Sequence, residues 1–446
     1  MSTEGPGLTF VVQPGGQLAG RLRVPGDKSI SHRAVMLGSL AEGISEVTGF
    51  LTGEDCLCTM KAFQAMGVRI EQLGPTHLRV HGVGLHGLKA PAGPLDLGNS
   101  GTSMRLMSGL MAAQAFETTL IGDSSLSKRP MRRIVDPLRS MGAVIATTDK
   151  GTSPLQFSPA ASLKAIAYDS PVASAQVKSG ILLAGLYAEG KTEVREPEPS
   201  RDHTERMLRG FGVSVDARPG YAAVQGGQRL KATHIEVPAD ISSATFPMVA
   251  AAIVPGADVL LEAVGINPTR TGVIDILRSM GATITLTHER MLGGEPVADI
   301  RVQGAALKGI TIGGDVVASA IDEFPAVFIA AACADGVTTV NDAEELRVKE
   351  SDRIAAMCDG LTALGVAAIA KPDGAIITGR GNASPIGSGT VDSKGDHRIA
   401  MSFAIAALRS TGPITILDCA NVNTSFPGFV ALMGGAGLRI SERAAS

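Results

Sequence analysis

The chain has 446 residues, of which 44% are hydrophobic and 19% are charged, and its formal net charge at pH 7 is −3. This length predicts two or three domains, and the composition is typical of a globular protein rather than a disordered one. The small net charge argues against a broad nucleic-acid-binding surface. Only 3% of the residues are aromatic and none is tryptophan, which argues against a platform for stacking bases or sugars.

The chain contains five cysteines, and its first residues show no basic segment followed by an apolar one. Cysteines that are few and odd in number are typical of a reducing compartment, and so we expect a cytoplasmic protein. Every long apolar run is broken by Pro, Asp or Gly within about 18 residues, which predicts no transmembrane helix. Cys56 and Cys58 have no second pair of ligands nearby, and we expect no metal site there.

A repeated pattern runs along the chain. The hexapeptide LRSMGA occurs at residues 138–143 and again at 277–282. Six glycines, spaced by about 70–85 residues, each follow an amphipathic stretch and precede alternating, strand-like sequence. They are Gly67, Gly142, Gly212, Gly281, Gly365 and Gly437. A glycine at such a place is typical of a helix C-terminus that needs left-handed backbone.

A second series of helices alternates with the amphipathic ones and is apolar nearly all round, which predicts that these helices are buried. In chain order they cover residues 31–40, 102–113, 174–186, 242–254, 322–334 and 396–408. Each leads into a short strand. The repeat is therefore predicted as strand, buried helix, strand, amphipathic helix, strand, strand, and three repeats per domain would place three buried helices inside a shell of sheets and outer helices.

The sequence also predicts where the two halves join. Residues 24–29 (VPGDKS) begin the first repeat, and residues 237–242 (VPADIS) begin the fourth. We therefore expect a first lobe at residues 21–240 and a second lobe at residues 241–446 together with residues 1–20. The strand-like segment at residues 8–12 is expected to complete the second lobe.

Polar and charged residues gather at the starts of the buried helices. A helix N-terminus offers free N–H groups and the positive end of a dipole, which is a ready site for an anion. Serine at such a start is ordinarily an N-cap, and we expect that role for residues 242–243. Cations there oppose the dipole and destabilise the helix unless an anion is bound. Lys28 and Arg33 at the first start, and His397 and Arg398 at the sixth, therefore predict an anionic ligand.

Two short runs concentrate further charge, four cations at residues 127–133 and a mixture of both signs at residues 347–353. Either run alone is typical of a solvated surface, but with the helix starts they indicate arms of one site. Asp322 and Glu323 precede an apolar helix, and capping accounts for only one of them. A carboxylate near Lys and Arg, as at Glu350, can act as a general base or acid.

Several common catalytic motifs do not occur. Residues 26–29 (GDKS) lack the adjacency and the upstream glycine of a phosphate-binding loop. The sequence has no GxSxG elbow, no HExxH and no paired CxxC. A kinase, a serine hydrolase and a zinc enzyme are therefore disfavoured.

Eight segments between about residues 8 and 440 resemble, in order and spacing, the family of 5-enolpyruvylshikimate-3-phosphate (EPSP) synthases. They are VPGDKSISHR, LGNSGTSMR, KRPMRR, SAQVKS, IDEFP, LRVKESDR, DHRIAMS and TSFPG. The runs NPTR at residues 267–270 and DHTERML at residues 202–208 resemble the second sequence class of this family, which is associated with tolerance of the herbicide glyphosate.

The resemblance implies two inside-out α/β domains that close on the substrates, with the active site in the cleft between them. It implies that the 5-hydroxyl of shikimate 3-phosphate adds to C2 of phosphoenolpyruvate, that C3 is protonated, and that phosphate is then eliminated. It implies no metal and no organic cofactor. We expect a monomer that binds these two substrates and is inhibited by glyphosate. We expect neither a nucleic acid nor a membrane as a partner.

The resemblance also implies roles for individual residues. Asp322 is the expected base near the 5-hydroxyl, Glu350 the expected proton donor to C3, and Lys28 the third catalytic residue. The residues implied for shikimate 3-phosphate are Lys28, Ser29, Arg33, Ser174, Ala175, Gln176, Arg201, Asp322 and Lys349. Those implied for phosphoenolpyruvate are Lys28, Gly101, Arg129, Gln176, Arg353, His397 and Arg398.

The chain departs from the family at two positions. Thr424 stands where many members carry a lysine, and Glu345 where some have an asparagine near the shikimate ring. We assign neither to the site. Gly101 leaves the phosphoenolpyruvate pocket open where a methyl group would shorten it, and we expect any glyphosate tolerance to be weaker than the class implies.

Two other functions compete with this hypothesis. The sister enolpyruvyl transferase that acts on UDP-N-acetylglucosamine usually has a reactive cysteine in the loop at residues 123–133, where this chain has none. The segments SAQVKS and KESDR also favour shikimate. A homologue that binds substrates without catalysis is disfavoured because Lys28, Asp322 and Glu350 are all present.

Overall fold

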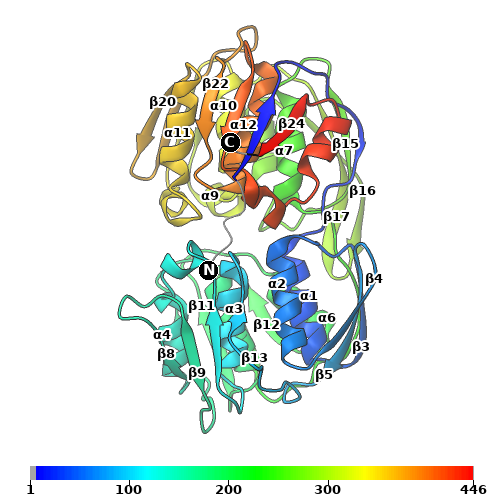
Figure 1. Cartoon of the computed structure of the whole chain (residues 1–446), viewed down its shortest axis with the longest axis vertical. Coiled ribbons are helices and arrows are strands. Elements are labelled where there is room, and N and C mark those ends of the chain that lie inside the picture. The colour runs from blue at the N-terminus through cyan, green and yellow to red at the C-terminus, as the bar shows by residue number, and fades with distance from the viewer. Residues whose placement is uncertain (1–6, 445–446) are drawn as a thin grey trace. The chain divides into compact units, whose positions relative to one another are not determined.

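Six four-stranded sheets of one common plan account for the strand order in residues 7–444, the part of the chain that the computed structural model describes. Counted from one edge, the second strand of each sheet pairs in parallel with the first and antiparallel with the third. Helices alternate with strands along the chain (Figure 1). The α/β class and the repeated architecture predicted from the sequence are confirmed.

The chain divides into two compact units. The first unit comprises residues 26–237 and 292–295, and the second comprises residues up to 25, 238–291 and 296 onward. Each unit has its own hydrophobic core, which includes Leu37, Met107 and Leu182 in the first and Val249, Ile329 and Phe403 in the second.

The first unit has three sheets. They are β14 (His234–Glu236), β3 (Glu42–Thr48), β5 (His77–Val83) and β4 (Arg69–Gly74); β6 (Leu95–Asp96), β7 (Thr118–Ile121), β9 (Leu155–Ser158) and β8 (Val144–Ala146); and β10 (Ala167–Asp169), β11 (Lys191–Arg195), β13 (Tyr221–Gln225) and β12 (Val215–Arg218). Its helices are α1 (Lys28–Leu40), α2 (Glu54–Ala65), α3 (Gly101–Met111), the short η1 (Leu126–Lys128), α4 (Arg132–Ser140), α5 (Ala175–Gly185) and α6 (His203–Gly210).

The second unit repeats the plan. Its sheets are β2 (Ala19–Leu22), β15 (Asp258–Gly265), β17 (Glu295–Gln303) and β16 (Thr283–Leu292); β18 (Thr311–Ile312), β19 (Val337–Val340), β21 (Gly374–Thr378) and β20 (Ala367–Lys371); and β22 (Gly389–Asp392), β23 (Ile414–Leu417), β1 (Leu8–Val12) and β24 (Ile440–Ala444). Its helices are α7 (Ile241–Ala252), α8 (Gly272–Ser279), α9 (Asp315–Ala320), α10 (Phe324–Cys333), η2 (Glu344–Val348), α11 (Arg353–Ala363), α12 (His397–Ala406), η3 (Ala407–Arg409), η4 (Ala420–Thr424) and α13 (Phe429–Gly435).

Two strands pair with a sheet of one unit although the helix that follows each of them belongs to the other unit. β2 comes directly before α1, but it pairs in parallel with β15 of the second unit, while β14 comes directly before α7 and pairs with β3 of the first. The division therefore falls at residues 25/26 and 237/238 instead of the predicted 20/21 and 240/241, and residues 292–295 go with the first unit. The physical reason is that a strand belongs where its backbone groups find hydrogen-bond partners.

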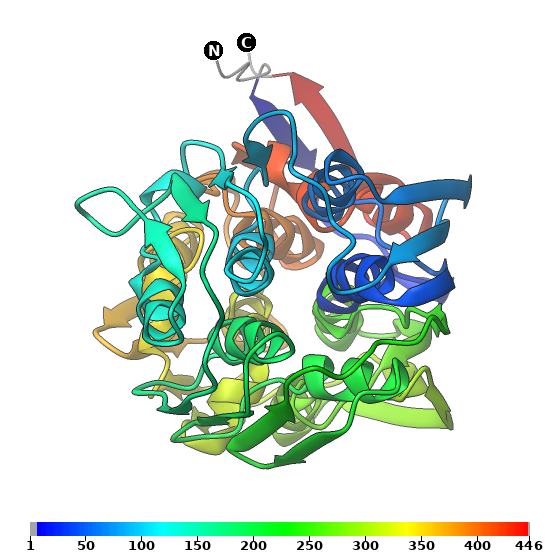
Figure 2. The same ribbon diagram turned by 90° about the horizontal axis from the view of Figure 1, so that it is seen from below.

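The buried and amphipathic helices alternate as the sequence predicts. All residues of α7 and α10 are buried, whereas α2, α4, α6, α8 and α11 each bury only part of their residues. Figure 2 shows α1, α3 and α5 of the first unit, in blue, light blue and green, with its strands outside them. The six glycines at the ends of the amphipathic helices all have positive φ, between 74° and 116°, and this prediction is confirmed.

Of residues 7–444, no stretch forms a helix both long and apolar enough to span a membrane. Within the same range, no cluster of three or more histidine, cysteine, aspartate or glutamate side chains is arranged to hold a metal ion.

Candidate functional site

The predicted site residues fall into two sets, one in each unit. The first unit carries Lys28, Ser29, Arg33, Gly101, Arg129, Ser174, Ala175, Gln176 and Arg201. The second unit carries Asp322, Lys349, Glu350, Arg353, His397 and Arg398. Within each unit, residues far apart in sequence come together at the starts of the buried helices.

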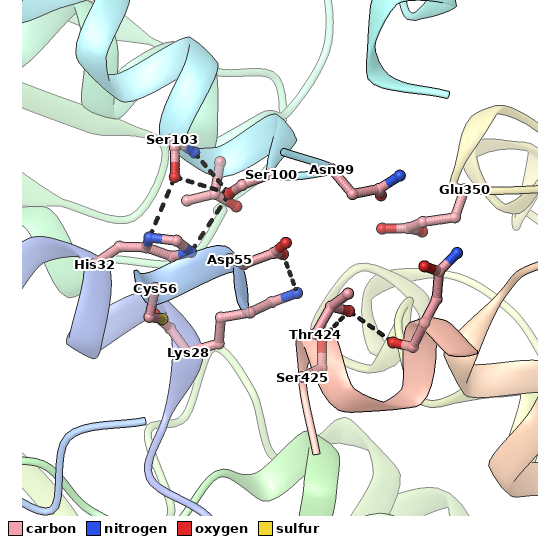
Figure 3. A network of polar contacts seen from close by, with 12 residues as sticks. Lys28, His32, Asp55, Cys56, Asn99, Ser100, Ser103, Glu350, Thr424 and Ser425 are labelled. Carbon is pink, nitrogen blue, oxygen red and sulfur yellow. Dashed lines mark hydrogen bonds and ion pairs between the residues drawn. The ribbon is translucent and has the colours of Figure 1, made fainter. Parts of the chain in front are cut away.

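The start of α1 holds a lysine against a carboxylate. Asp27 caps the helix, since its Oδ1 accepts a hydrogen bond from the Ile30 amide at 2.8 Å. Lys28 Nζ lies 3.1 Å from Asp55 Oδ2 on α2, and both side chains are largely buried (Figure 3). The acidic partner offsets the cost of a cation at a helix start and fixes the ammonium group in place.

Arg33 is held by three hydrogen bonds inside the first unit. Its guanidinium donates to Thr204 Oγ1 at 2.6 Å, to the Ser29 carbonyl at 2.9 Å and to Ser179 Oγ at 2.9 Å. Burial lowers the pKa of Arg33 to about 10, although the nearby Glu205 carboxylate opposes this shift. A guanidinium has five N–H donors, and these three bonds leave two N–H donors for further contacts.

The guanidinium of Arg129 lies beside the start of α3. Gly101 is the first residue of α3, and the guanidinium of Arg129 donates to Asn99 Oδ1 at 2.6 Å, two residues upstream. One turn into the helix, Arg105 donates to Gln176 Oε1 at 2.6 Å. The predicted residues Gly101, Arg129 and Gln176 are thus linked through Asn99 and Arg105.

Asn99 and Arg105 are site residues that the sequence reasoning missed, as is Asp55. Arg105 carries the clearest signal, since a lone arginine interrupts an otherwise apolar helix four residues after the helix start. Asn99 lies inside the LGNSGTSMR segment itself. Asp55 has no comparable signal, because an acidic residue in the first turn of a helix is ordinary.

The start of α5 rests on a buried group of charges. Ser174 caps α5 through the Val177 amide, and its own amide donates to Glu196 Oε1 at 2.7 Å. Lys178 Nζ lies 3.1 Å from Glu196 Oε2 and 3.0 Å from Glu205 Oε1. Burial alone would lower the pKa of Lys178, but the two carboxylates raise it overall, and the lysine is charged.

Ala175 and Arg201 complete the predicted set of the first unit. Ala175 is the first residue of α5, so its backbone amide belongs to the helix start. Arg201 lies half-buried between β11 and α6, directly after the loop that carries Glu196.

In the second unit, one buried guanidinium gathers three carboxylates. Arg353 lies 3.2 Å from Asp322, 2.6 Å from Glu350 and 2.8 Å from Asp396. Burial alone would lower the pKa of Arg353, but these carboxylates raise it overall, and the arginine stays charged. Lys349 Nζ lies 3.6 Å from Asp322 Oδ1 and adds a second cation.

The start of α12 adjoins this cluster. Asp396 caps α12 by accepting from the Arg398 amide at 2.9 Å. The Arg398 guanidinium donates to the Asp322 carbonyl at 2.9 Å and lies 3.7 Å from Glu323 Oε1. His397 is the first residue of α12 and is buried.

Two capping predictions are wrong. Glu323 occupies the N-cap position of α10 without a side-chain capping bond, and Asp322 instead faces Arg353, so capping accounts for neither carboxylate. At α7 the cap is Asp240, whose carboxylate accepts from the Ser242 amide at 2.9 Å. The Ser242 hydroxyl lies between Glu323, to which it donates, and Arg270, from which it accepts at 2.6 Å. Asp322 and Ser242 instead interact with buried charged residues on other elements, and these interactions replace the capping roles that the sequence favoured.

The two charged runs contribute unequally. Of the run at residues 127–133, Arg129 bonds within the α3 region, while Arg132 reaches the Asp149 carbonyl on an exposed loop. In the second run, Arg347 pairs with Asp352 at 2.6 Å at the surface, while the residues that follow supply Lys349, Glu350 and Arg353. Each run therefore mixes surface residues with residues of the charged clusters.

These clusters are typical of a class of protein, an α/β enzyme of repeated architecture whose helix starts can bind small anions. A family model described as EPSP synthase (3-phosphoshikimate 1-carboxyvinyltransferase) matches residues 12–433. A 3-phosphoshikimate 1-carboxyvinyltransferase from Methylococcus capsulatus is 64% identical and covers 97% of this chain and 98% of its own, and one from Alkalilimnicola ehrlichii is 60% identical with 98% and 97% covered. A solved EPSP synthase structure from Acinetobacter baumannii is 57% identical, with a TM-score of 0.89, and covers 98% of this chain and all of that one. The chain belongs to the EPSP synthase family.

Proposed function

We propose that the two sets of predicted site residues, one in each unit, catalyse the reaction of this family in this protein. The enzyme transfers the enolpyruvyl group of phosphoenolpyruvate to the 5-hydroxyl of shikimate 3-phosphate. In the addition step, the hydroxyl oxygen bonds to C2, the hydroxyl proton leaves to a base, and C3 gains a proton. In the elimination step, C3 loses a proton, the C2–O bond to phosphate breaks, and the double bond forms again.

The observation that carries the assignment is the placement of Asp322 and Glu350 on one buried guanidinium. Arg353 and Lys349 favour the ionised form of Asp322, which suits a base for the 5-hydroxyl proton. Glu350 must hold a proton in order to deliver it to C3. An anionic substrate bound to Arg353 would weaken the 2.6 Å ion pair between Arg353 and Glu350. The negative charge of that substrate next to Glu350 would also raise the proton affinity of the Glu350 carboxylate.

We assign most of the binding of the two anionic substrates to the first unit. Ser174, Ala175 and Gln176 at the start of α5 would hold the 3-phosphate, with Arg201, Ser29 and Arg33 around it. Lys28, Gly101 and Arg129 would bind phosphoenolpyruvate, and we assign His397 and Arg398 to the same substrate. Preorganised cations at helix starts stabilise the charge that develops in the transition state without reorganising.

We also propose that the chain works as a monomer without a metal or an organic cofactor. The NPTR run supports membership of the second sequence class. Its Arg270 is buried and pairs with Asp240 at 3.1 Å, which gives this motif a structural role at the start of α7.

Phosphate release with both substrates present tests this function. Wild type should release phosphate only when shikimate 3-phosphate and phosphoenolpyruvate are both added. Asp322→Asn and Glu350→Gln should each lower kcat by about 10²–10⁴, the range for loss of a general acid or base. Asp359→Asn removes an exposed carboxylate of the same helix as Arg353 and should leave kcat unchanged. Absence of phosphate release from wild type that binds both substrates would refute the proposal.

A further inference from the structure

A closed group of four buried polar side chains joins three helices of the first unit. His32 lies on α1, Thr59 on α2, and Ser100 and Ser103 at the start of α3. His32 Nδ1 lies 2.8 Å from Thr59 Oγ1, which lies 2.6 Å from Ser103 Oγ. Ser103 Oγ lies 2.8 Å from Ser100 Oγ, and Ser100 Oγ lies 3.5 Å from His32 Nε2 (Figure 3). We call these four side chains the histidine ring.

The hydrogen bonds around the histidine ring can all run in one direction, and Ser103 Oγ also lies 3.3 Å from His32 Nδ1 across the ring. Ser103 donates to Ser100, whose oxygen also accepts from the Ser103 amide at 3.1 Å as the cap of α3. The Ser100 proton can then point to His32 Nε2, His32 Nδ1–H to Thr59, and the Thr59 proton to Ser103. Thr59 Oγ1 also lies 3.3 Å from the Asp55 carbonyl oxygen, but its separation from Ser103 is shorter. Each side chain therefore donates once and accepts at least once, which requires a neutral imidazole.

The surroundings keep this imidazole neutral. All four side chains are buried, with at most 1% of each exposed. Burial holds the pKa of His32 well below its ordinary value, and the neighbouring cations Lys28 and Arg33 lower it further, while Asp27 opposes them. A protonated imidazole would donate from both nitrogens and would reverse the bond to Ser100.

We propose that His32 is a positioning residue that fixes the start of α3, and with it Gly101, relative to Lys28 of α1 and Asp55 of α2. The inference rests on the proposed function, because it assigns to this start a share of phosphoenolpyruvate binding. Ser100 directly precedes Gly101, Thr59 sits one turn after Asp55, and His32 one turn after Lys28. The histidine ring thus joins the helix turns that carry two proposed contacts to this substrate, Lys28 and Gly101, and the turn that carries Asp55, the partner of Lys28.

The chemistry of the ring argues for positioning instead of simple core filling. Apolar side chains of similar volume would fill this space without the cost of burying polar groups. A fully satisfied polar network instead specifies one arrangement of the elements that it joins. Groups that bind a small anion need such precision, since displacement by about 1 Å can cost 10²-fold in rate.

The test compares three variants by kinetics and by hydrogen exchange. Thr59→Val keeps the shape of the side chain and removes the hydroxyl, and Ser103→Ala opens the ring at another member. Thr192→Val is the matched control, because Thr192 of β11 is fully buried and its hydroxyl has no partner among the described residues. Thr59→Val and Ser103→Ala should raise KM for phosphoenolpyruvate about tenfold, the worth of a buried hydrogen bond, and KM for shikimate 3-phosphate less than twofold.

Hydrogen exchange provides a readout that does not depend on turnover. The amides of residues 100–111 should exchange about tenfold faster in both ring variants, while those of residues 175–185 on α5 and the Thr192→Val protein stay at the wild-type rate. Unchanged exchange at residues 100–111, an equal rise of KM for both substrates, or the same changes in Thr192→Val would each overturn the proposal. If wild type released no phosphate, the proposed function would fail, while exchange would still show whether the ring fixes α3.

Discussion

Gly101 stands at the first position of α3 with two guanidinium groups beside it. A methyl group added there would lie 2.9 Å from one nitrogen of Arg105 and 3.2 Å from one of Arg129. Both neighbours are the far ends of flexible side chains, so they can move without a backbone shift. A substitution at Gly101 should therefore change the shape of the proposed phosphoenolpyruvate pocket and leave the fold intact.

Gly101→Ala should consequently discriminate between phosphoenolpyruvate and the longer glyphosate. We expect the inhibition constant of glyphosate to rise at least about tenfold, the lower range for one methyl group in a tight pocket, and KM for phosphoenolpyruvate to rise by less. Steady-state kinetics with glyphosate as the varied inhibitor measures both. Gly93→Ala, in an open loop position with no atom within 4 Å, is the control. An equal rise of both constants would contradict the steric account.

At the scale of single residues, the sequence indicated which charged residues gather at helix starts and in short runs, but it did not indicate which residues they pair with. Lys28 stands out because a cation at a helix start needs a counter-charge, and Arg353 stands out because it ends a run of mixed charge. Their partners Asp55 and Asp396 lie 27 and 43 residues away, and no local pattern connects them. The prediction that capping accounts for one of Asp322 and Glu323 failed for a similar reason, since Ser242, which donates to Glu323, lies 81 residues upstream.

At the scale of elements, α3 and α5 cross through two glycines. A Cβ added at Gly109 would lie 2.0 Å from the Gly180 carbonyl oxygen, and one added at Gly180 would lie 2.8 Å from the Arg105 carbonyl oxygen. These are backbone atoms and cannot turn aside. The glycines therefore permit a close backbone approach between the two helices whose starts carry Gly101 and Ser174.

Gly109→Ala should separate these helices and destabilise the first unit. We expect the free energy of unfolding to fall by about 3 kcal/mol, the upper part of the usual range for overpacking a core. Denaturant unfolding followed by circular dichroism measures this change. Gly210→Ala is the matched control, because this helical glycine of α6 has no atom within 4 Å of an added Cβ, and alanine favours a helix by about 0.5–1 kcal/mol. A stability loss at Gly210 equal to that at Gly109 would contradict the packing argument.

The repeat itself was readable from the sequence because each copy encodes the same local needs. Glycines such as Gly142 and Gly281 must have positive φ at a helix end, and apolar helices such as α7 must be buried. The exchange of β2 and β14 was not readable. Both are strands of three or four residues, and their parallel partners lie about 190–240 residues away, beyond the reach of a periodicity argument.

At the scale of the whole molecule, the buried neutral histidine makes stability depend on pH. Because burial, with Lys28 and Arg33, lowers the pKa of His32 in the folded chain, the unfolded chain binds a proton more readily below about pH 6.5. The stability that follows from the neutral state is fully present above pH 6.5 and falls as the pH drops below it. Between pH 7.5 and 5.5, one such group costs about 1.4 kcal/mol of unfolding free energy.

His32→Asn should remove this contribution, since asparagine does not titrate. We expect the loss of unfolding free energy between pH 7.5 and 5.5 to be smaller in His32→Asn than in wild type by about 1.4 kcal/mol. Denaturant unfolding at the two pH values measures this difference, and every other titrating group cancels when the proteins are compared. His234→Asn removes an exposed histidine of the same unit and is the matched control. The same loss in wild type and His32→Asn would mean that His32 takes up its proton in the folded chain, and the one-directional hydrogen bonds of the histidine ring could not then persist at pH 5.5.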